Sequence, residues 1–209
     1  MLALKLASMK ILFGLMAMMG VSMVAQAIET PHYTVIRRSE VFEIRQYDPY
    51  CVAEVEVSGP ATDAGNRAFP ILAGYIFGKN HSKQTMAMTA PVVQKSNSVK
   101  MDMTAPVTQI PNRDGFIVQF VMSKKYTLAT LPVPDDSRVK LREVPTQTVA
   151  VIRYSGTWSQ GNYDKHLEKL KTALQKEGVA IRGEPIYSRY NPPFTPWFMR
   201  TNEIGFEVQ

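Results

Sequence analysis

Hydrophobic and polar residues alternate over several short stretches of the chain, which is the period of a β-strand with one buried face. In residues 51–57 (CVAEVEV), for example, Cys51 and Val55 fall on one face, whereas Glu54 and Glu56 fall on the other. The same alternation marks residues 42–47, 116–125, 149–155, 185–190 and 203–208. The pattern predicts a domain rich in antiparallel strands.

Two segments between these stretches have the spacing of amphipathic helices. Residues 62–77 carry an apolar stripe made of Phe69, Leu72, Ala73 and Ile76. Gly78 ends this helix, and Pro70 predicts a kink or a restart inside it because the proline ring removes a backbone hydrogen bond. A second helix is predicted from Asn162, as N-cap, to Gly178, as the left-handed residue after the last turn. Its apolar stripe consists of Tyr163, Leu167, Leu170 and Leu174.

A tandem repeat, TMAMTAPV at residues 85–92 and KMDMTAPV at residues 100–107, is the most distinctive pattern in the chain. Each copy alternates and then stops at Ala-Pro, so the repeat predicts two short paired strands near a sheet edge. Thioether sulfurs can bind haem iron or copper. Packing inside a barrel explains the alternating methionines more simply: Met86, Met88, Met101 and Met103.

The order of elements is strand, strand, helix, strand, strand, followed by the same series again. We therefore predict an α+β fold, a distorted eight-stranded antiparallel barrel built from two ββαββ halves with two helices packed outside. Residues 126–138 are predicted to form a surface loop rather than a linker between domains. Residues 28–209 are then one domain, a size that can bury an ordinary core.

Residues 1–27 have the features of a cleavable signal peptide. Lys5 and Lys10 form a basic start, residues 11–24 are apolar, and residues 25–27 (AQA) match a cleavage site. Cleavage predicts a secreted, periplasmic protein without a stable membrane anchor; a retained anchor is the alternative. Loss of the two lysines lowers the formal charge from +6 to +4, which is too small and scattered to indicate nucleic-acid binding.

Motifs of catalysis are not found in the sequence, which has no H-E-x-x-H, G-x-S-x-G, phosphate-binding glycine loop or C-x-x-C. No catalytic residue and no metal site are therefore predicted, and the protein is not expected to be an enzyme. His32, His81 and His166 are expected in ordinary surface or half-buried positions. Cys51, the single cysteine, cannot form an internal disulfide and is expected to be a small buried hydrophobic residue rather than a reactive thiol.

Residues 190–200 (YNPPFTPWFMR) combine three prolines with four aromatic residues. Such a segment cannot be regular structure, yet it is too apolar for an ordinary exposed loop. It forms either a lid on the core or one wall of an apolar site. A planar hydrophobic ligand suits aromatic walls, and Arg67, Lys79 or Arg200 could then bind its carboxylates.

Four segments together resemble the SOUL / haem-binding protein family: residues 42–47 (FEIRQY), residues 68–80 (AFP…GYIFGKN), the tandem MTAPV, and residues 190–208. The resemblance covers residues 28–209 and implies a duplicated barrel that binds haem or another tetrapyrrole non-covalently, without catalysis. It also implies a cleft between the first helix and the late proline-rich loop. Its walls are then Arg67, Phe69, Leu72 and Ile76 on the helix, and Tyr190, Pro193, Phe194 and Trp197 on the loop.

Three positions depart from the family pattern. Some members have a histidine, proposed to ligate iron, where this chain has Gln46, and others have basic residues where it has Asn66 and Thr195. The absence of the histidine predicts little or no axial ligation, and the absence of the two basic residues predicts weaker contacts with the propionates. A carrier or sensor of lipophilic, including cationic, small molecules is the alternative function, because the duplicated unit also resembles the effector-binding domains of multidrug-responsive regulators. A buried carboxylate in the cleft, for instance Glu184 or Glu203, would favour that alternative. The sequence does not determine the oligomeric state.

Overall fold

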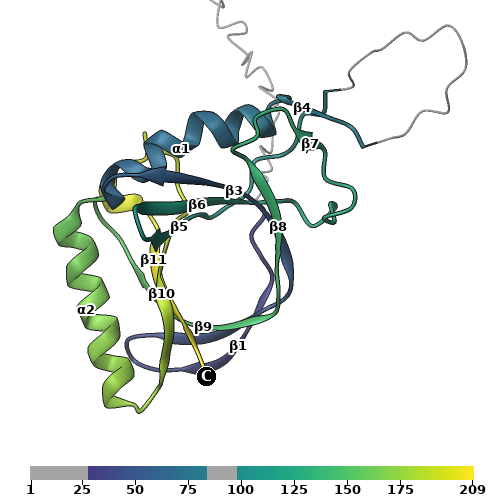
Figure 1. Ribbon diagram of the computed structural model, residues 1–209. Coiled ribbons are helices and arrows are strands. Elements are labelled where there is room, and N and C mark those ends of the chain that lie inside the picture. Colours follow the sequence, from purple (N-terminus) through teal and green to yellow (C-terminus); the bar gives the residue numbers. More distant parts are fainter. Residues whose placement is uncertain (1–27, 84–97) are drawn as a thin grey trace, which may run out of the picture.

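The computed structural model describes residues 28–83 and 98–209, and their main element is one curled antiparallel sheet of nine strands (Figure 1). Its spatial order is β1-β2-β9-β11-β10-β5-β6-β3-β8. The strands are β1 (Tyr33–Arg38), β2 (Glu43–Tyr47), β3 (Tyr50–Ser58), β5 (Val107–Asn112), β6 (Gly115–Val121), β8 (Lys140–Val144), β9 (Gln147–Tyr154), β10 (Ile181–Arg189) and β11 (Asn202–Val208). The predicted α+β fold with a barrel-like sheet is thus confirmed.

The strand order reveals an internal two-fold relation between two ββαββ halves. The first half is β2-β3-α1-β5-β6 and the second is β8-β9-α2-β10-β11. The equivalent strands are β2 and β8, β3 and β9, β5 and β10, and β6 and β11. When each strand is replaced by its equivalent, the order from β2 to β8 becomes the same order read backwards. The first strand of each half therefore pairs with a strand of the other half: β2 with β9, and β8 with β3. The strand β1 is one strand more than the sequence predicted. A two-stranded sheet, β4 (Asn80–His81) with β7 (Val133–Pro134), joins the end of α1 to the loop at residues 126–138.

Helix α1 (Ala61–Ile76) lies over β3 and β6 on the outer side of the curl (Figure 1). Leu72 and Ile76 have exposed fractions of 0% and 2% and pack in a core cluster with Val55, Val118 and Phe120. The helix is continuous through Pro70, so the predicted restart is not seen. Proline is accommodated because α1 is packed along its length, and tertiary burial outweighs the loss of one hydrogen bond.

Helix α2 (Gln160–Lys176) lies on the outer side of the other half, against β9 and β11 (Figure 1). Its buried residues Tyr163, Leu170 and Leu174 form a second core cluster with residues of those strands. The helix begins after Ser159 rather than at the predicted cap Asn162, whose amide instead donates to Thr157 O over 2.8 Å. Gly178 has φ +68° and ends the helix as predicted.

The predicted strand in the second copy of the repeat is not present. Residues 100–104 are irregular, and β5 begins only at Val107, after the proline that was expected to end the strand. Met101 is buried whereas Met103 is 38% exposed, so the two do not share one buried face. Met101 N–H donates to Ile76 O and Ala105 N–H to Glu29 O, which fixes the segment to two separate elements instead of a ladder. The first copy, including Met86 and Met88, lies outside the described residues.

Candidate ligand-binding site

The segment between β10 and β11 is a compact loop that includes the 3-10 helix η1 (Trp197–Met199). The side chain of Arg200 links parts of this loop: its Nε donates to Thr195 O over 2.8 Å and its Nη2 donates to Pro193 O over 2.7 Å. Gly156 N–H also donates to Trp197 O over 3.1 Å. The proline-rich segment is therefore held in one conformation by its own arginine and by the chain after β9.

Trp158 lies at the base of this loop and was not singled out from the sequence. The guanidinium carbons of Arg189 and Arg200 lie 4.6 and 4.1 Å from the centre of its ring. Arg189 also donates to Tyr163 Oη in α2 and to Ala61 O at the start of α1. These contacts tie the loop base to the first turns of both helices.

The side chains of the loop are unusually exposed for their size and apolarity. Exposed fractions are 86% for Phe194, 59% for Trp197, 63% for Phe198 and 64% for Met199. Phe69 on α1 is 42% exposed and packs against Phe120 with ring centres 5.7 Å apart. Large apolar side chains gathered in this way mark a binding surface more often than a passive one.

The residues predicted for the helix wall occupy two different environments. Arg67 and Phe69 are exposed, and Arg67 Nη1 donates to Ser58 O over 2.9 Å. Leu72 and Ile76 belong to the core beneath α1, so a ligand on the outer surface does not reach them in this conformation. The loop residues Pro193, Phe194 and Trp197 are exposed. The assignment of these residues to a haem site stays a prediction. The exposed residues among them are the ones that a ligand on the outer surface could contact.

Tyr190 points away from this surface and belongs to a polar network on the inner face of the sheet. Its hydroxyl donates to Glu203 Oε2 over 2.7 Å. Arg45 donates to both oxygens of Glu203, over 3.0 and 3.1 Å, and also to Glu43 and Tyr47. Arg45 and Glu203 are 3% and 5% exposed. Burial raises the pKa of Tyr47 to about 12 and that of Tyr190 further. Sequence reasoning missed this ion pair because 158 residues separate its partners.

The space inside the curl is nearly filled by these side chains. A cavity of about 40 Å³ remains there, lined among others by Tyr47, Val151 and Glu203. A tetrapyrrole needs several hundred Å³ by the ordinary size of ligand pockets, about 300–1,000 Å³. The inner cavity is therefore too small to accept one.

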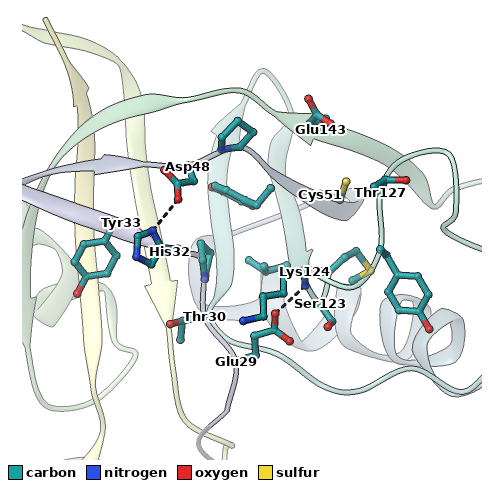
Figure 2. Close-up of a pocket in the computed structure, with 16 residues that line it drawn as sticks. Glu29, Thr30, His32, Tyr33, Asp48, Cys51, Ser123, Lys124, Thr127 and Glu143 are labelled. Carbon is teal, nitrogen blue, oxygen red and sulfur yellow. Dashed lines mark hydrogen bonds and ion pairs between the residues drawn. The ribbon is translucent and has the colours of Figure 1, made fainter.

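A pocket of about 610 Å³ opens between the N-terminal segment and the edge of β3 and β8 (Figure 2). His32 Nδ1 lies 2.7 Å from Asp48 Oδ2, and Glu29 Oε1 accepts from Lys124 N–H over 2.8 Å. Cys51 reaches the pocket wall but is 7% exposed, and burial raises the pKa of its thiol, as expected for a buried hydrophobic residue. The pocket was not predicted because four segments that are separate in the sequence form it.

A shallower groove runs beside Trp197 at the start of α2. Its lining includes Thr157, Lys165 and His166 and contains no carboxylate. His166 is half-buried as predicted; its ring stacks on Tyr154 with centres 4.0 Å apart, and its Nδ1 lies 2.8 Å from Asn162 O. Within residues 28–83 and 98–209, no group of three or more His, Cys, Asp or Glu side chains is arranged to hold a metal ion.

The curled sheet with two outer helices defines an α+β domain with a barrel-like sheet, and its β10–β11 loop exposes large apolar side chains. The SOUL heme-binding protein family model matches residues 28–207, and the chain belongs to this family. It is 27% identical over 189 residues to heme-binding protein 1 of Sus scrofa, covering 85% of this chain and 92% of that protein. It is 26% identical over 190 residues to heme-binding protein 2 of Homo sapiens, covering 86% of each.

Solved structures of low sequence identity share the fold. The C-terminal domain of EcmrR is 12% identical, has a TM-score of 0.54, and is matched over 85% of this chain and 98% of that one. A protein described as a hydrolase from Listeria innocua is 12% identical, has a TM-score of 0.52, and is matched over 83% of this chain and 94% of that one. At such identities the likeness concerns the fold alone.

Proposed function

We propose that the chain is an exported haem- or tetrapyrrole-binding protein that holds the ring against its exposed aromatic surface, with little or no axial ligation. The observation that carries the proposal is the exposure of Phe194 and Trp197 in the β10–β11 loop, together with the exposed Phe69 on α1, in a member of the SOUL family. Apolar rings that remain in water can be covered by a planar ligand at about 25 cal/mol per Å² of buried apolar area, before the costs of ordering.

Charge favours this surface over the larger pocket. A tetrapyrrole with propionates is anionic, whereas the pocket near the N-terminal segment carries Glu29, Asp48 and Glu143. Around the loop, Lys165 lines the groove with Trp197, and Arg153 Nη2 donates to Thr201 Oγ1 over 3.4 Å. These two cations were not predicted from the sequence, because only the fold brings β9 and α2 next to the loop. They take the place of Arg200, because two of its guanidinium nitrogens donate to loop carbonyls.

Two features support the proposal that the protein supplies little or no axial ligand to the haem iron. Gln46, at the position where some family members have histidine, is exposed on β2 and pairs with Thr34 of β1 and Thr148 of β9. It is therefore not part of the aromatic surface. His32 and His81 each pair with an aspartate, at 2.7 and 2.9 Å. The fit between chain and ring thus rests on apolar contact and on cations for the carboxylates.

The alternative, a carrier of lipophilic cations, has less support. Glu203 is the buried carboxylate that such a carrier needs, but Arg45 already neutralises it through two hydrogen bonds. The other candidate, Glu184, is exposed on β10 and does not form a desolvated site. A cation entering the inner cavity would have to displace Arg45, which costs the buried ion pair.

Haem titration of purified protein tests the proposal. Saturable binding should appear in the Soret band and as quenching of tryptophan, since Trp197 lies on the surface. Phe69→Asp is expected to raise Kd by about tenfold or more, because it places a charge where apolar contact is needed. Phe77→Asp is the matched control, since Phe77 is 58% exposed near the other end of α1. Absence of saturable binding, or equal effects of the two substitutions, contradicts the proposed site.

Export is a separate part of the proposal, supported by the basic, apolar and AQA regions of residues 1–27. Fractionation of the host, followed by N-terminal sequencing, is expected to find a periplasmic protein that begins at Ile28. Recovery of the chain with its first 27 residues intact would exclude cleavage.

A further inference from the structure

Phe198 and Met199 lie beyond the residues assigned to the ring, yet they are as exposed as their neighbours. They follow Trp197 directly in η1, and Phe194 lies three residues upstream of it. Four large apolar side chains therefore project from one short loop, more than one flat ring needs. Phe198 and Met199 are therefore available for a contact other than the proposed haem binding.

Many backbone polar groups of the loop do not depend on water for a hydrogen bond. Pro192, Pro193 and Pro196 have no N–H group to satisfy. Six successive or near-successive carbonyls of the loop accept hydrogen bonds from within the protein: Pro192, Pro193, Thr195, Pro196, Trp197 and Phe198. Unpaired polar groups are what normally keeps a loop out of an apolar medium. In this loop six carbonyls are already paired, and the side chains of Arg200 and Ser155 supply three of the donors.

The surroundings of the loop are basic. Arg153 and Lys165 are exposed, and Lys165 lines the groove beside Trp197, whose lining has no carboxylate. Anionic lipid headgroups attract such cations near the membrane surface. Aromatic side chains at the level of the headgroups are the usual partners of that attraction.

We propose that the β10–β11 loop docks the protein on an anionic lipid bilayer by inserting Phe198 and Met199 into the interfacial layer. A protruding loop of this kind fits a deformable layer, which needs no complementary shape, better than a preformed protein groove. In residues 28–83 and 98–209, no helix has the length and apolarity required to cross a membrane. Insertion of two side chains from one loop is peripheral and reversible, and it places the ring-binding surface at the membrane.

Vesicle co-sedimentation of the purified protein tests the proposal. Binding to phosphatidylcholine vesicles that contain phosphatidylglycerol is expected to exceed binding to pure phosphatidylcholine, and to weaken as salt screens the cations. Phe198→Asp combined with Met199→Asp should lower the partition coefficient on the mixed vesicles by about tenfold or more, because both apolar contacts are lost. Ile36→Asp is the control: Ile36 is 54% exposed on β1, and its substitution should leave the partition unchanged.

Two outcomes overturn the proposal. One is equal binding of the parent protein and the double variant to mixed vesicles. The other is absence of vesicle binding together with a molar mass that rises with concentration in the parent but not in the double variant, which would assign the loop to contacts between copies of the chain. Haem titration without vesicles is run in parallel. Its failure bears on the proposed function alone, since Phe198 and Met199 are not among the residues assigned to the ring.

Discussion

Replacing Arg45 with methionine is expected to lower the free energy of unfolding by about 3–5 kcal/mol, the usual effect of removing one partner of a buried ion pair. Arg45 is 3% exposed and makes a two-pronged contact with Glu203, which is itself 5% exposed. Without the guanidinium, the Glu203 carboxylate stays buried with Tyr190 as its remaining hydrogen-bond donor among the contacts described above. Urea unfolding followed by circular dichroism measures the loss.

Arg38→Met is the matched control. Arg38 pairs with Glu43 over 3.1 Å, but its side chain is 74% exposed, so the loss should stay below about 1 kcal/mol. Adding Glu203→Leu to Arg45→Met should restore most of the stability, because it removes the uncompensated charge. A small effect of Arg45→Met, or a double variant that loses more than the single one, would show that the pair does not hold the inner face together.

The helices and most strands could be predicted because their signals are local. Leu72, Ile76, Leu170 and Leu174 recur at helical spacing, and all four are buried in the structure. The two helix ends at Gly78 and Gly178 follow from the need for positive φ, found at +113° and +68°. Duplication, read from the order of elements, was enough to predict the sheet but not its additional strand β1.

The repeat was misread because alternation reports only local geometry. Met101 and Met103 have the spacing of a strand, but a strand also needs a neighbour whose backbone groups pair with it. Here the backbone of residues 101–105 is paired with the end of α1 and with Glu29 instead. Such contacts depend on where α1 ends in space, which a period of two cannot reveal.

The candidate surface was predicted in its residue types but not in its arrangement. The density of proline and aromatic residues predicted that residues 190–200 form either a lid on the core or one wall of an apolar site, and the structure leaves the large apolar side chains of this segment exposed. The segment contacts Trp158, on which Arg189 also packs, and lies near Lys165 because the fold brings β9, β10 and α2 together, which the sequence does not reveal. Leu72 and Ile76 were assigned to the wall because a stripe at helical spacing identifies the apolar face of a helix. That face is the one the sheet buries, whereas Phe69 lies at its edge.

Raising the pH from about 9 to about 11 is expected to destabilise the fold by several kcal/mol, because five buried or half-buried tyrosines resist ionisation. Burial raises the pKa of Tyr47 and of Tyr187 to about 12, and it also raises the pKa of Tyr75, Tyr154 and Tyr190. An unfolded tyrosine releases its proton near pH 10. Above that pH the unfolded chain binds fewer protons than the native protein, so stability present at lower pH is lost as the pH rises. Each such group contributes about 1.4 kcal/mol per pH unit until its folded pKa is reached.

Urea unfolding at a series of pH values measures this slope, and Tyr187→Phe isolates one tyrosine from the lysines that titrate in the same range. Phenylalanine keeps the ring that packs 5.1 Å from Tyr163 but has no proton to lose. The variant should match the parent near pH 8 and lose stability less steeply above about pH 10, by about 1.4 kcal/mol per pH unit. Equal slopes in the two proteins would mean that Tyr187 ionises in the native state, and hence that water reaches its hydroxyl behind α2.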